Sequence, residues 1–308
     1  MITQTLTVSS SDGMQLPGML WLPEGDVRAV VQITHGMTEH IGRYEALAQL
    51  LTDHGIAAAG FDLRGHGKNP GSRLCASFGE GGWEKSLKDM QALHTLINEK
   101  LPGIPHFMLG FSLGSFLLRE YLSHNPEGVS GAVIMGTGHQ PAAVLRLMMA
   151  IVKTQFKKAG ADGTTPLVQQ LSFGVYNQKF KPNRTASDWL CADEAQLDAY
   201  LDDPLCRKEI SATLFYELLS CMQRTGSKNA YDTWNQSLPV LLLSGREDPV
   251  GDAGKGVKAV WSAMKKAGMT HAEMHLFENA RHDLMHEEAG AAADARDTLL
   301  KWLIKNIP

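Results

Sequence analysis

The sequence predicts an α/β protein whose mostly parallel sheet is covered by helices on both faces. Short apolar runs such as AVVQIT (29–34) and IAAAGF (56–61) are separated by segments with helical spacing. This alternation is typical of parallel strands joined by crossover helices. It stops between residues 139 and 237 and resumes at 239–243. We therefore expect a helical insertion between two strands of one domain.

The predicted elements follow in order along the chain. Residues 5–8 and 18–22 flank a Ser-Asp-Gly turn and predict a hairpin. Later strands are expected at 29–34, 56–61, 106–110, 131–135, 239–243 and 271–277, and helices at 44–54, 83–100, 113–124, 256–267 and 287–307. Residues 1–308 thus form a single domain with an inserted, mainly helical cap at 139–237.

Composition excludes several classes of protein. With 44% hydrophobic and 20% charged residues and a net charge of −4, the chain has the make-up of an ordinary globular protein. The sequence contains no stripe of basic residues, so we expect no nucleic-acid partner. No apolar run reaches 18 residues, and no Cys/His spacing predicts a metal site. The first residues lack the charged and apolar regions of a signal peptide, so we expect a cytoplasmic protein.

The strongest motif is Gly110-Phe111-Ser112-Leu113-Gly114, which matches G-x-S-x-G. It ends a predicted strand and begins a predicted helix. A sharp turn of this kind exposes a serine in a strained conformation that small flanking residues permit. Because the pattern also occurs by chance, this context and the partners of the serine decide its meaning. Ser112 is the predicted nucleophile.

A serine nucleophile needs a histidine base and a carboxylate that orients it, and both follow later strands here. Asp248 comes directly after the strand that ends near Gly245, with Glu247 and Asp252 as neighbouring alternatives. His282 follows the last predicted strand. His286 is its alternative, but we expect it on the final helix in contact with solvent.

A loop after strand 29–34 can complete such a site. His35-Gly36-Met37 follows that strand, and the N–H of Met37 can donate to a developing oxyanion. The N–H of Leu113, at the start of a helix, supplies the second donor. His35 itself is expected to be structural and to lie beneath the site.

Together these segments resemble the monoacylglycerol lipase and lysophospholipase family of α/β-hydrolases. The matching stretches are HGMTEHIGRY (35–44), DLRGHG (62–67), GFSLG (110–114), SGREDPV (244–250) and ARHDLMHE (280–287), and the segment 176–205 also resembles bacterial lysophospholipases. The resemblance implies hydrolysis of esters of single-chain acyl lipids by Ser112, Asp248 and His282, without a metal or organic cofactor. Phe111 and Leu113 depart from the family, in which His and Met are common.

The cap is expected to hold the acyl chain. Residues 142–153 (AAVLRLMMAIVK) predict an apolar helix with basic residues, which either packs in the cap core or forms an acyl-tunnel wall that touches a membrane surface. Met148 and Met149 suit a variable alkyl chain. Phe215 is a candidate for the opposite wall, although a core position is its simpler interpretation, and Phe111 is included with these substrate contacts. For Trp189 and Trp234 both lining and packing stay open.

Two other functions compete with this prediction. A peptidase or thioesterase on the same fold would use the same three residues, because substrate choice depends on the cap. A binding module without catalysis would normally lack one of the three residues, and all three positions are filled here.

Overall fold

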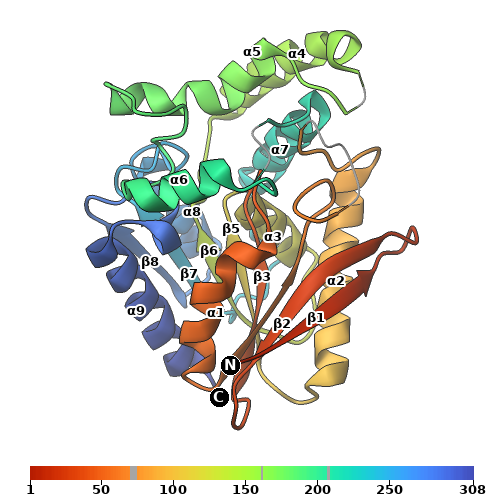
Figure 1. Cartoon of the computed structure of the whole chain (residues 1–308), viewed down its shortest axis with the longest axis vertical. Helices are drawn as coiled ribbons and strands as arrows, with labels where there is room; N and C mark the ends of the chain where they lie inside the picture. Colours follow the sequence, from red (N-terminus) through yellow and green to blue (C-terminus); the bar gives the residue numbers. More distant parts are fainter. Residues whose placement is uncertain (70–74, 161, 207–208) are drawn as a thin grey trace.

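The computed structural model describes residues 1–69, 75–160, 162–206 and 209–308, and it contains an eight-stranded sheet between two layers of helices (Figure 1). The order of the strands is β1-β2-β4-β3-β5-β6-β7-β8. The pairs β1–β2 and β2–β4 are antiparallel, and all other pairs are parallel. The predicted class is therefore confirmed. The strands are β1 (Ile2–Ser9), β2 (Gln15–Leu22), β3 (Ala29–Thr34), β4 (Ile56–Phe61), β5 (His106–Phe111), β6 (Val129–Met135), β7 (Val240–Gly245) and β8 (Ala272–Phe277).

The central strands carry apolar residues on both faces because helices cover both faces. Every residue of β3, β4, β5 and β7 is buried, which explains their continuous apolar runs. One apolar cluster joins the sheet to α2 (Gly82–Lys100), α3 (Leu113–Ser123) and α8 (Lys255–Lys266). The other joins it to α1 (Glu45–Thr52) and α9 (Ala289–Asn306).

Two predicted helices differ at their ends. The helix expected at 44–54 is a 3-10 turn, η1 (Ile41–Tyr44), followed by α1. The helix expected at 287–307 begins at Ala289, after a separate 3-10 turn, η4 (Leu284–His286). Both short turns lie in the loops that follow strands, where the candidate site is built.

Residues 139–237, here called the inserted segment, connect β6 to β7. The described helices of this segment lie above the carboxyl ends of the central strands (Figure 1), whereas residues 226–237 return alongside α3 toward the start of β7, where Thr233 Oγ1 donates to the Ser123 carbonyl (2.8 Å). The described part of the inserted segment contains helices and turns, and its one strand-like contact is an isolated bridge between Ile210 and Ala76. The helical elements are α4 (Ala142–Ala159), α5 (Pro166–Gln169), η2 (Gln170–Gly174), η3 (Tyr176–Phe180), α6 (Glu194–Asp202) and α7 (Ala212–Thr225). Residues 161, 207 and 208 of this segment lie outside the described residues.

A buried arginine of α3 binds the chain at the start of the inserted segment and again at the end of α7. Arg119 is 1% exposed, and it donates to Thr137 Oγ1 (3.2 Å) and the Gly138 carbonyl (3.1 Å) where the segment begins. It also donates to the Thr225 carbonyl (3.0 Å) and the Tyr231 hydroxyl (2.9 Å) where the segment returns. The helix that follows Ser112 therefore holds the start of the inserted segment close to the end of α7.

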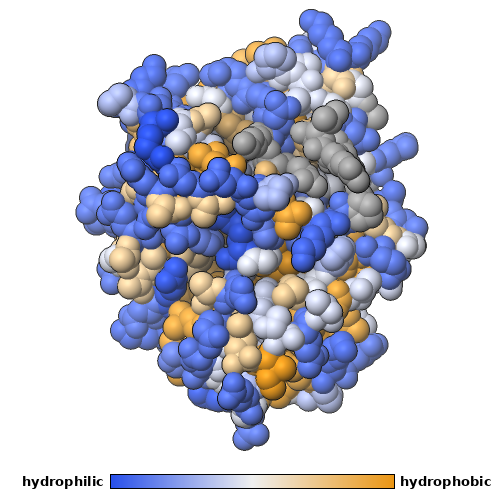
Figure 2. All heavy atoms as spheres, viewed as in Figure 1, coloured by the Kyte–Doolittle hydropathy of each residue, from blue (hydrophilic) through white to orange (hydrophobic). Residues whose placement is uncertain are grey.

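The outer surface in the orientation of Figure 1 is mainly hydrophilic, with hydrophobic side chains scattered between polar ones (Figure 2). Within the described residues, no helix combines the length and apolar character needed to cross a bilayer.

Candidate active site

Ser112 occupies a sharp turn between β5 and α3, with φ 50° and ψ −117°. This left-handed φ is strained for a residue with a side chain. The two glycines of the motif permit the turn by close packing: a Cβ at Gly110 would lie 2.4 Å from the Gly114 carbonyl oxygen, and one at Gly114 would lie 2.1 Å from the Thr34 carbonyl oxygen. The elbow predicted from the sequence is thus present in the backbone.

Asp248 and His282, from loops after two neighbouring strands, are in contact. His282 Nδ1 donates to Asp248 Oδ2 over 3.0 Å, and both side chains are at most 1% exposed. The other Asp248 oxygen accepts the Val250 N–H at 2.8 Å. Glu247 and Asp252, the alternatives for the acid, have exposed side chains. The structure therefore brings Asp248, rather than its neighbours, to the histidine.

The imidazole of His282 lies between two aromatic rings. Its centroid is 4.9 Å from that of Phe111, which precedes the serine, and 5.1 Å from that of Trp189 in the inserted segment. His282 Nε2 is buried and has no hydrogen-bond partner among the described residues. With Nδ1 donating to Asp248, Nε2 is the nitrogen left to accept a proton.

The backbone N–H groups of Met37 and Leu113 are available as donors. Among the described residues, neither donates a hydrogen bond to the protein, whereas the N–H of Ser112 donates to the Met135 carbonyl (2.9 Å). Leu113 is the first residue of α3, so its N–H has no acceptor within the helix. Met37 and Ser112 line the same cavity.

His35 lies beneath this loop and is fully buried. Its Nδ1 donates to the Gly36 carbonyl (2.7 Å), and its Nε2 accepts the Leu63 N–H (2.9 Å). Burial lowers the pKa of His35 to about 3, so the ring is neutral and structural, as the sequence led us to expect.

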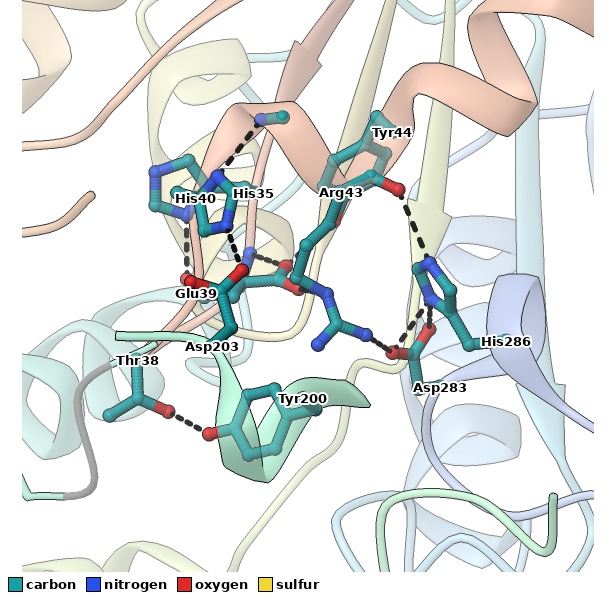
Figure 3. Close-up of polar contacts among 12 residues, drawn as sticks. His35, Thr38, Glu39, His40, Arg43, Tyr44, Tyr200, Asp203, Asp283 and His286 are labelled. Atoms are coloured by element: carbon teal, nitrogen blue, oxygen red, sulfur yellow. Dashed lines mark hydrogen bonds and ion pairs between the residues drawn. The ribbon is translucent and has the colours of Figure 1, made fainter. Parts of the chain in front are cut away.

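A charged network supports the loop from the core side (Figure 3). Buried Glu39 accepts the Gly36 N–H (2.5 Å) and the Tyr44 hydroxyl (2.8 Å) and pairs with Arg43 Nε (3.2 Å). Arg43 also pairs with Asp283 at 2.9 Å. Burial opposes ionisation of Asp283, but His286 and Arg43 outweigh it and lower the pKa of that carboxyl to about 2. The network therefore links the loop after β3 to the loop that carries His282.

His286 does not lie on the final helix in solvent, and that expectation was wrong. It belongs to η4, its side chain is 14% exposed, and Nδ1 contacts Asp283 at 2.9 Å. Nε2 donates to the Arg43 carbonyl at 3.2 Å. Burial works to lower the pKa of His286, but the Asp283 carboxylate outweighs it and raises that pKa. His286 thus serves the network beside His282.

A cavity of about 600 Å³ lies between the inserted segment and the sheet edge. Its floor includes Met37, Phe111, Ser112 and His282, which are four of the site residues predicted from the sequence. The inserted segment supplies both apolar and polar walls to this cavity. The apolar wall residues are Phe173, Trp189, Leu190 and Leu201. The polar wall residues are Thr164, Thr165, Gln169, Gln170, Ser187 and Tyr200.

Three of the predicted substrate contacts lie elsewhere in the described structure. Met149 and Phe215 are buried in the apolar cluster that joins α4 and α7 to the sheet, and Met148 packs against that cluster. None of the three lines the cavity. Trp234 is also buried in this cluster, whereas Trp189 lines the cavity. The packing thus favours the core interpretation for Met149 and Phe215.

The described residues contain one group that could hold a metal ion: His40, Asp203 and Cys206, with ligand atoms within 4.8 Å of one another. His40 Nδ1 accepts the Gly42 N–H (3.2 Å), so Nε2 carries the proton and donates to Asp203 (2.7 Å). Burial raises the pKa of the Cys206 thiol to about 12. Because a metal would have to displace both protons, the arrangement favours a hydrogen-bonded contact.

Sequence reasoning missed the residues of the inserted segment that reach the site. Tyr200 contacts Thr38 across 162 positions, and Asp283 N–H donates to the Leu190 carbonyl (2.7 Å). Arg281 donates to the carbonyls of Asp188 (2.6 Å) and Cys191 (3.2 Å). No periodicity marks such contacts, because they depend on how the segment folds back.

Comparisons with known proteins agree with this geometry. The family model described as "Serine aminopeptidase, S33" matches residues 25–289. Human monoglyceride lipase is 26% identical over 280 residues, covering 91% of this chain and 83% of that protein. A monoglyceride lipase homolog of monkeypox virus is 24% identical over 289 residues, covering 93% of each.

Solved structures share the whole fold. A thermostable carboxyl esterase from Bacillus coagulans in complex with glycerol has a TM-score of 0.88 at 22% identity and covers 100% of both chains. A soluble variant of monoglyceride lipase from Saccharomyces cerevisiae, in complex with a substrate analog, has a TM-score of 0.77 at 19% identity, covering 100% of this chain and 97% of that one. The resemblance drawn from the sequence is thereby confirmed. The chain has the α/β-hydrolase fold and belongs to the serine aminopeptidase, S33 family.

Proposed function

We propose that this protein is a serine hydrolase that cleaves carboxylic esters of single-chain acyl lipids, such as monoacylglycerols or lysophospholipids, through an acyl-enzyme on Ser112. The observation that carries the proposal is the arrangement around the cavity floor. Ser112 opens into the cavity, and the free Nε2 of His282 is backed by buried Asp248. Relatives named as monoglyceride lipases support the ester class.

The proposed reaction has two steps, acylation of Ser112 and hydrolysis of the acyl-enzyme. Ser112 Oγ attacks the ester carbonyl while His282 Nε2 takes its proton, and Asp248 stabilises the imidazolium. The N–H groups of Met37 and Leu113 bind the oxyanion. The C–O bond breaks, His282 protonates the leaving alcohol, and the acyl group stays on Ser112. Water, deprotonated by His282, then attacks the acyl carbonyl. The tetrahedral intermediate collapses by breaking the bond to Ser112 Oγ, which takes the proton back from His282, and the fatty acid is released.

The exposed residues of α4 and α5 support a transient contact of the protein with a lipid membrane. On α4, Leu147 is 63% exposed and Val144 is 42% exposed. The helix contains Arg146, Lys153 and two further lysines and no acidic residue. Leu167 of α5, beside cavity residue Pro166, is 41% exposed. An apolar face with basic residues suits an anionic membrane interface, from which a single-chain lipid would enter.

The proposed nucleophile is tested by Ser112→Ala. We expect loss of at least about 10³-fold in kcat on a medium-chain monoacylglycerol, because the covalent step is abolished. A fluorophosphonate probe should label the wild type and not the variant. The control is Ser187→Ala, which removes another serine of the cavity wall. Equal labelling of the wild type and Ser112→Ala would refute the assignment.

A peptidase is the second candidate, because the matching family is described as an aminopeptidase and carboxylates border the cavity. Glu39 and Asp283 are both paired with Arg43, whereas Glu209 has an exposed side chain that could bind a peptide ammonium. Acyl esters and thioesters of rising chain length should be compared with aminoacyl amides. Faster turnover of the amides would favour the peptidase over the lipase.

A further inference from the structure

The loop that supplies the Met37 N–H contains a strained residue. We call residues 36–40 the oxyanion loop. Thr38, directly after Met37, has φ 66°. This conformation is unusual for a β-branched residue and costs about 1–3 kcal/mol when nothing compensates for it. Thr38 therefore needs fixed partners if the turn is to hold the Met37 N–H in one position beside the cavity.

Part of the support comes from the core. Glu39 accepts the Gly36 N–H (2.5 Å) and is itself held by Tyr44 and Arg43. These contacts fix the first residue of the oxyanion loop. They do not reach the Thr38 side chain, which lines the cavity and faces the inserted segment.

The rest comes from α6 and the residue after it (Figure 3). Thr38 Oγ1 donates to the Met37 carbonyl (2.5 Å), so the Tyr200 hydroxyl donates to Thr38 Oγ1 (2.7 Å). One residue past α6, Asp203 accepts from His40 Nε2 (2.7 Å). Two residues of the inserted segment, Tyr200 and Asp203, thus hold the oxyanion loop, at Thr38 and at His40 respectively.

We propose that Tyr200 and Asp203 are positioning residues that hold the strained turn at Thr38, so that the oxyanion donor of Met37 is aligned only while α6 is docked. The inference rests on the proposed function and extends it to the inserted segment. The adjoining stretch of that segment also binds the histidine loop, through Leu190 to Asp283 and through Asp188 to Arg281. Docking of residues 188–203 therefore aligns the oxyanion donor and the base together.

The principal test is Tyr200→Phe, which removes the hydroxyl and keeps the ring under Arg43 (4.9 Å from guanidinium carbon to ring centroid). We expect kcat to fall about 10-fold with KM within about twofold, because an oxyanion contact is strongest in the transition state. A trifluoromethyl ketone, which forms an oxyanion adduct with the serine, should bind about 10-fold more weakly, whereas binding of the fatty-acid product should be unchanged.

Two further variants separate positioning from general stability. Thr38→Ala removes the acceptor of the same hydrogen bond, so Thr38→Ala combined with Tyr200→Phe should be no slower than the slower single variant. Asp203→Asn keeps an oxygen for His40 and should retain more kcat than Asp203→Ala. Asp198→Asn is the control on α6, since Asp198 pairs with Arg184 at the surface (2.7 Å). It should leave kcat and inhibitor binding unchanged.

The outcomes discriminate between the hypotheses. Unchanged kcat and unchanged ketone affinity in Tyr200→Phe would overturn the inference, and so would equal loss of ketone and product binding. Both results leave the proposed function intact if Ser112→Ala is inactive. If Ser112→Ala keeps full activity, the proposed function itself fails.

Discussion

At the scale of single residues, Gly36 shows how closely the oxyanion loop is packed against the elbow. A Cβ at this position would lie 2.9 Å from Glu39 Oε1 and 3.0 Å from Phe111 Cδ1. Neither neighbour has room to move, because Glu39 is held by three partners and Phe111 packs against His282. The loop and the elbow therefore have to shift together when this residue changes.

We predict that Gly36→Ala lowers kcat about 10-fold or more, because the added methyl group displaces Met37 and the loop that carries its N–H. The measurement is steady-state hydrolysis together with the rate of fluorophosphonate labelling. Gly25→Ala is the matched control, since a Cβ at Gly25 has no atom within 4 Å. Full activity of Gly36→Ala would show that the loop adapts freely.

The sequence predicted the turn at Ser112 and the contact between Asp248 and His282, but it did not predict the residues that support them. Ser112, Asp248 and His282 each follow a strand, and parallel strands place their carboxyl ends at one edge, so their proximity follows from the pattern. Tyr200 and Trp189 lie in the inserted segment, whose path over that edge no periodicity encodes. His286 was misplaced because a buried ion pair with Asp283 stops the histidine from joining the final helix in solvent.

At the scale of elements, α4 combines two roles that its sequence left open. One face, with Leu145, Met149 and Val152, is buried, and this explains why Met149 does not reach the cavity. The opposite face exposes Leu147 with basic residues around it. Apolar residues on both faces made the helix resemble a tunnel wall in the sequence, whereas the packing assigns one face to the core and leaves the other to the surface.

We predict that Leu147→Glu weakens binding to vesicles of phosphatidylcholine and phosphatidylserine about 10-fold, from lost apolar insertion and charge repulsion. Co-sedimentation measures the binding, and turnover of a short-chain soluble ester should stay at the wild-type rate. Thr95→Glu introduces the same charge at an exposed position of α2, and this variant should bind vesicles as the wild type does. Unchanged binding of Leu147→Glu would remove α4 from the proposed membrane contact.

At the scale of the whole molecule, buried histidines make stability depend on pH. Burial lowers the pKa of His35 and of His106 to about 3. Below a pH of about 6.5 these two histidines become protonated in the unfolded chain but stay neutral in the folded protein. Each histidine therefore lowers the free energy of unfolding by about 1.4 kcal/mol for every pH unit that the pH falls. His286, whose pKa is raised, acts oppositely: its contribution is complete below 6.5 and is lost as the pH rises through its folded pKa.

We therefore expect the free energy of unfolding in urea to fall between pH 6.5 and pH 5. His106→Gln should reduce this slope by about 1.4 kcal/mol per pH unit, because the unfolded variant has one histidine fewer to protonate. His54→Gln, at an exposed site, serves as the control and should keep the wild-type slope. Identical slopes for the wild type and His106→Gln would contradict the explanation.

The clamp formed by Arg119 has a consequence for how such proteins can diversify. One side chain of α3 binds the carbonyls of Gly138 and Thr225, so the stretch between them, which supplies walls of the cavity, is fixed at both ends by a residue outside it. Recombination at these two points would replace the walls of the cavity without disturbing the elbow. A replacement would also have to restore the contacts of residues 188–203 with the oxyanion loop and with the loop that carries His282, so the cavity walls and the catalytic alignment would change together.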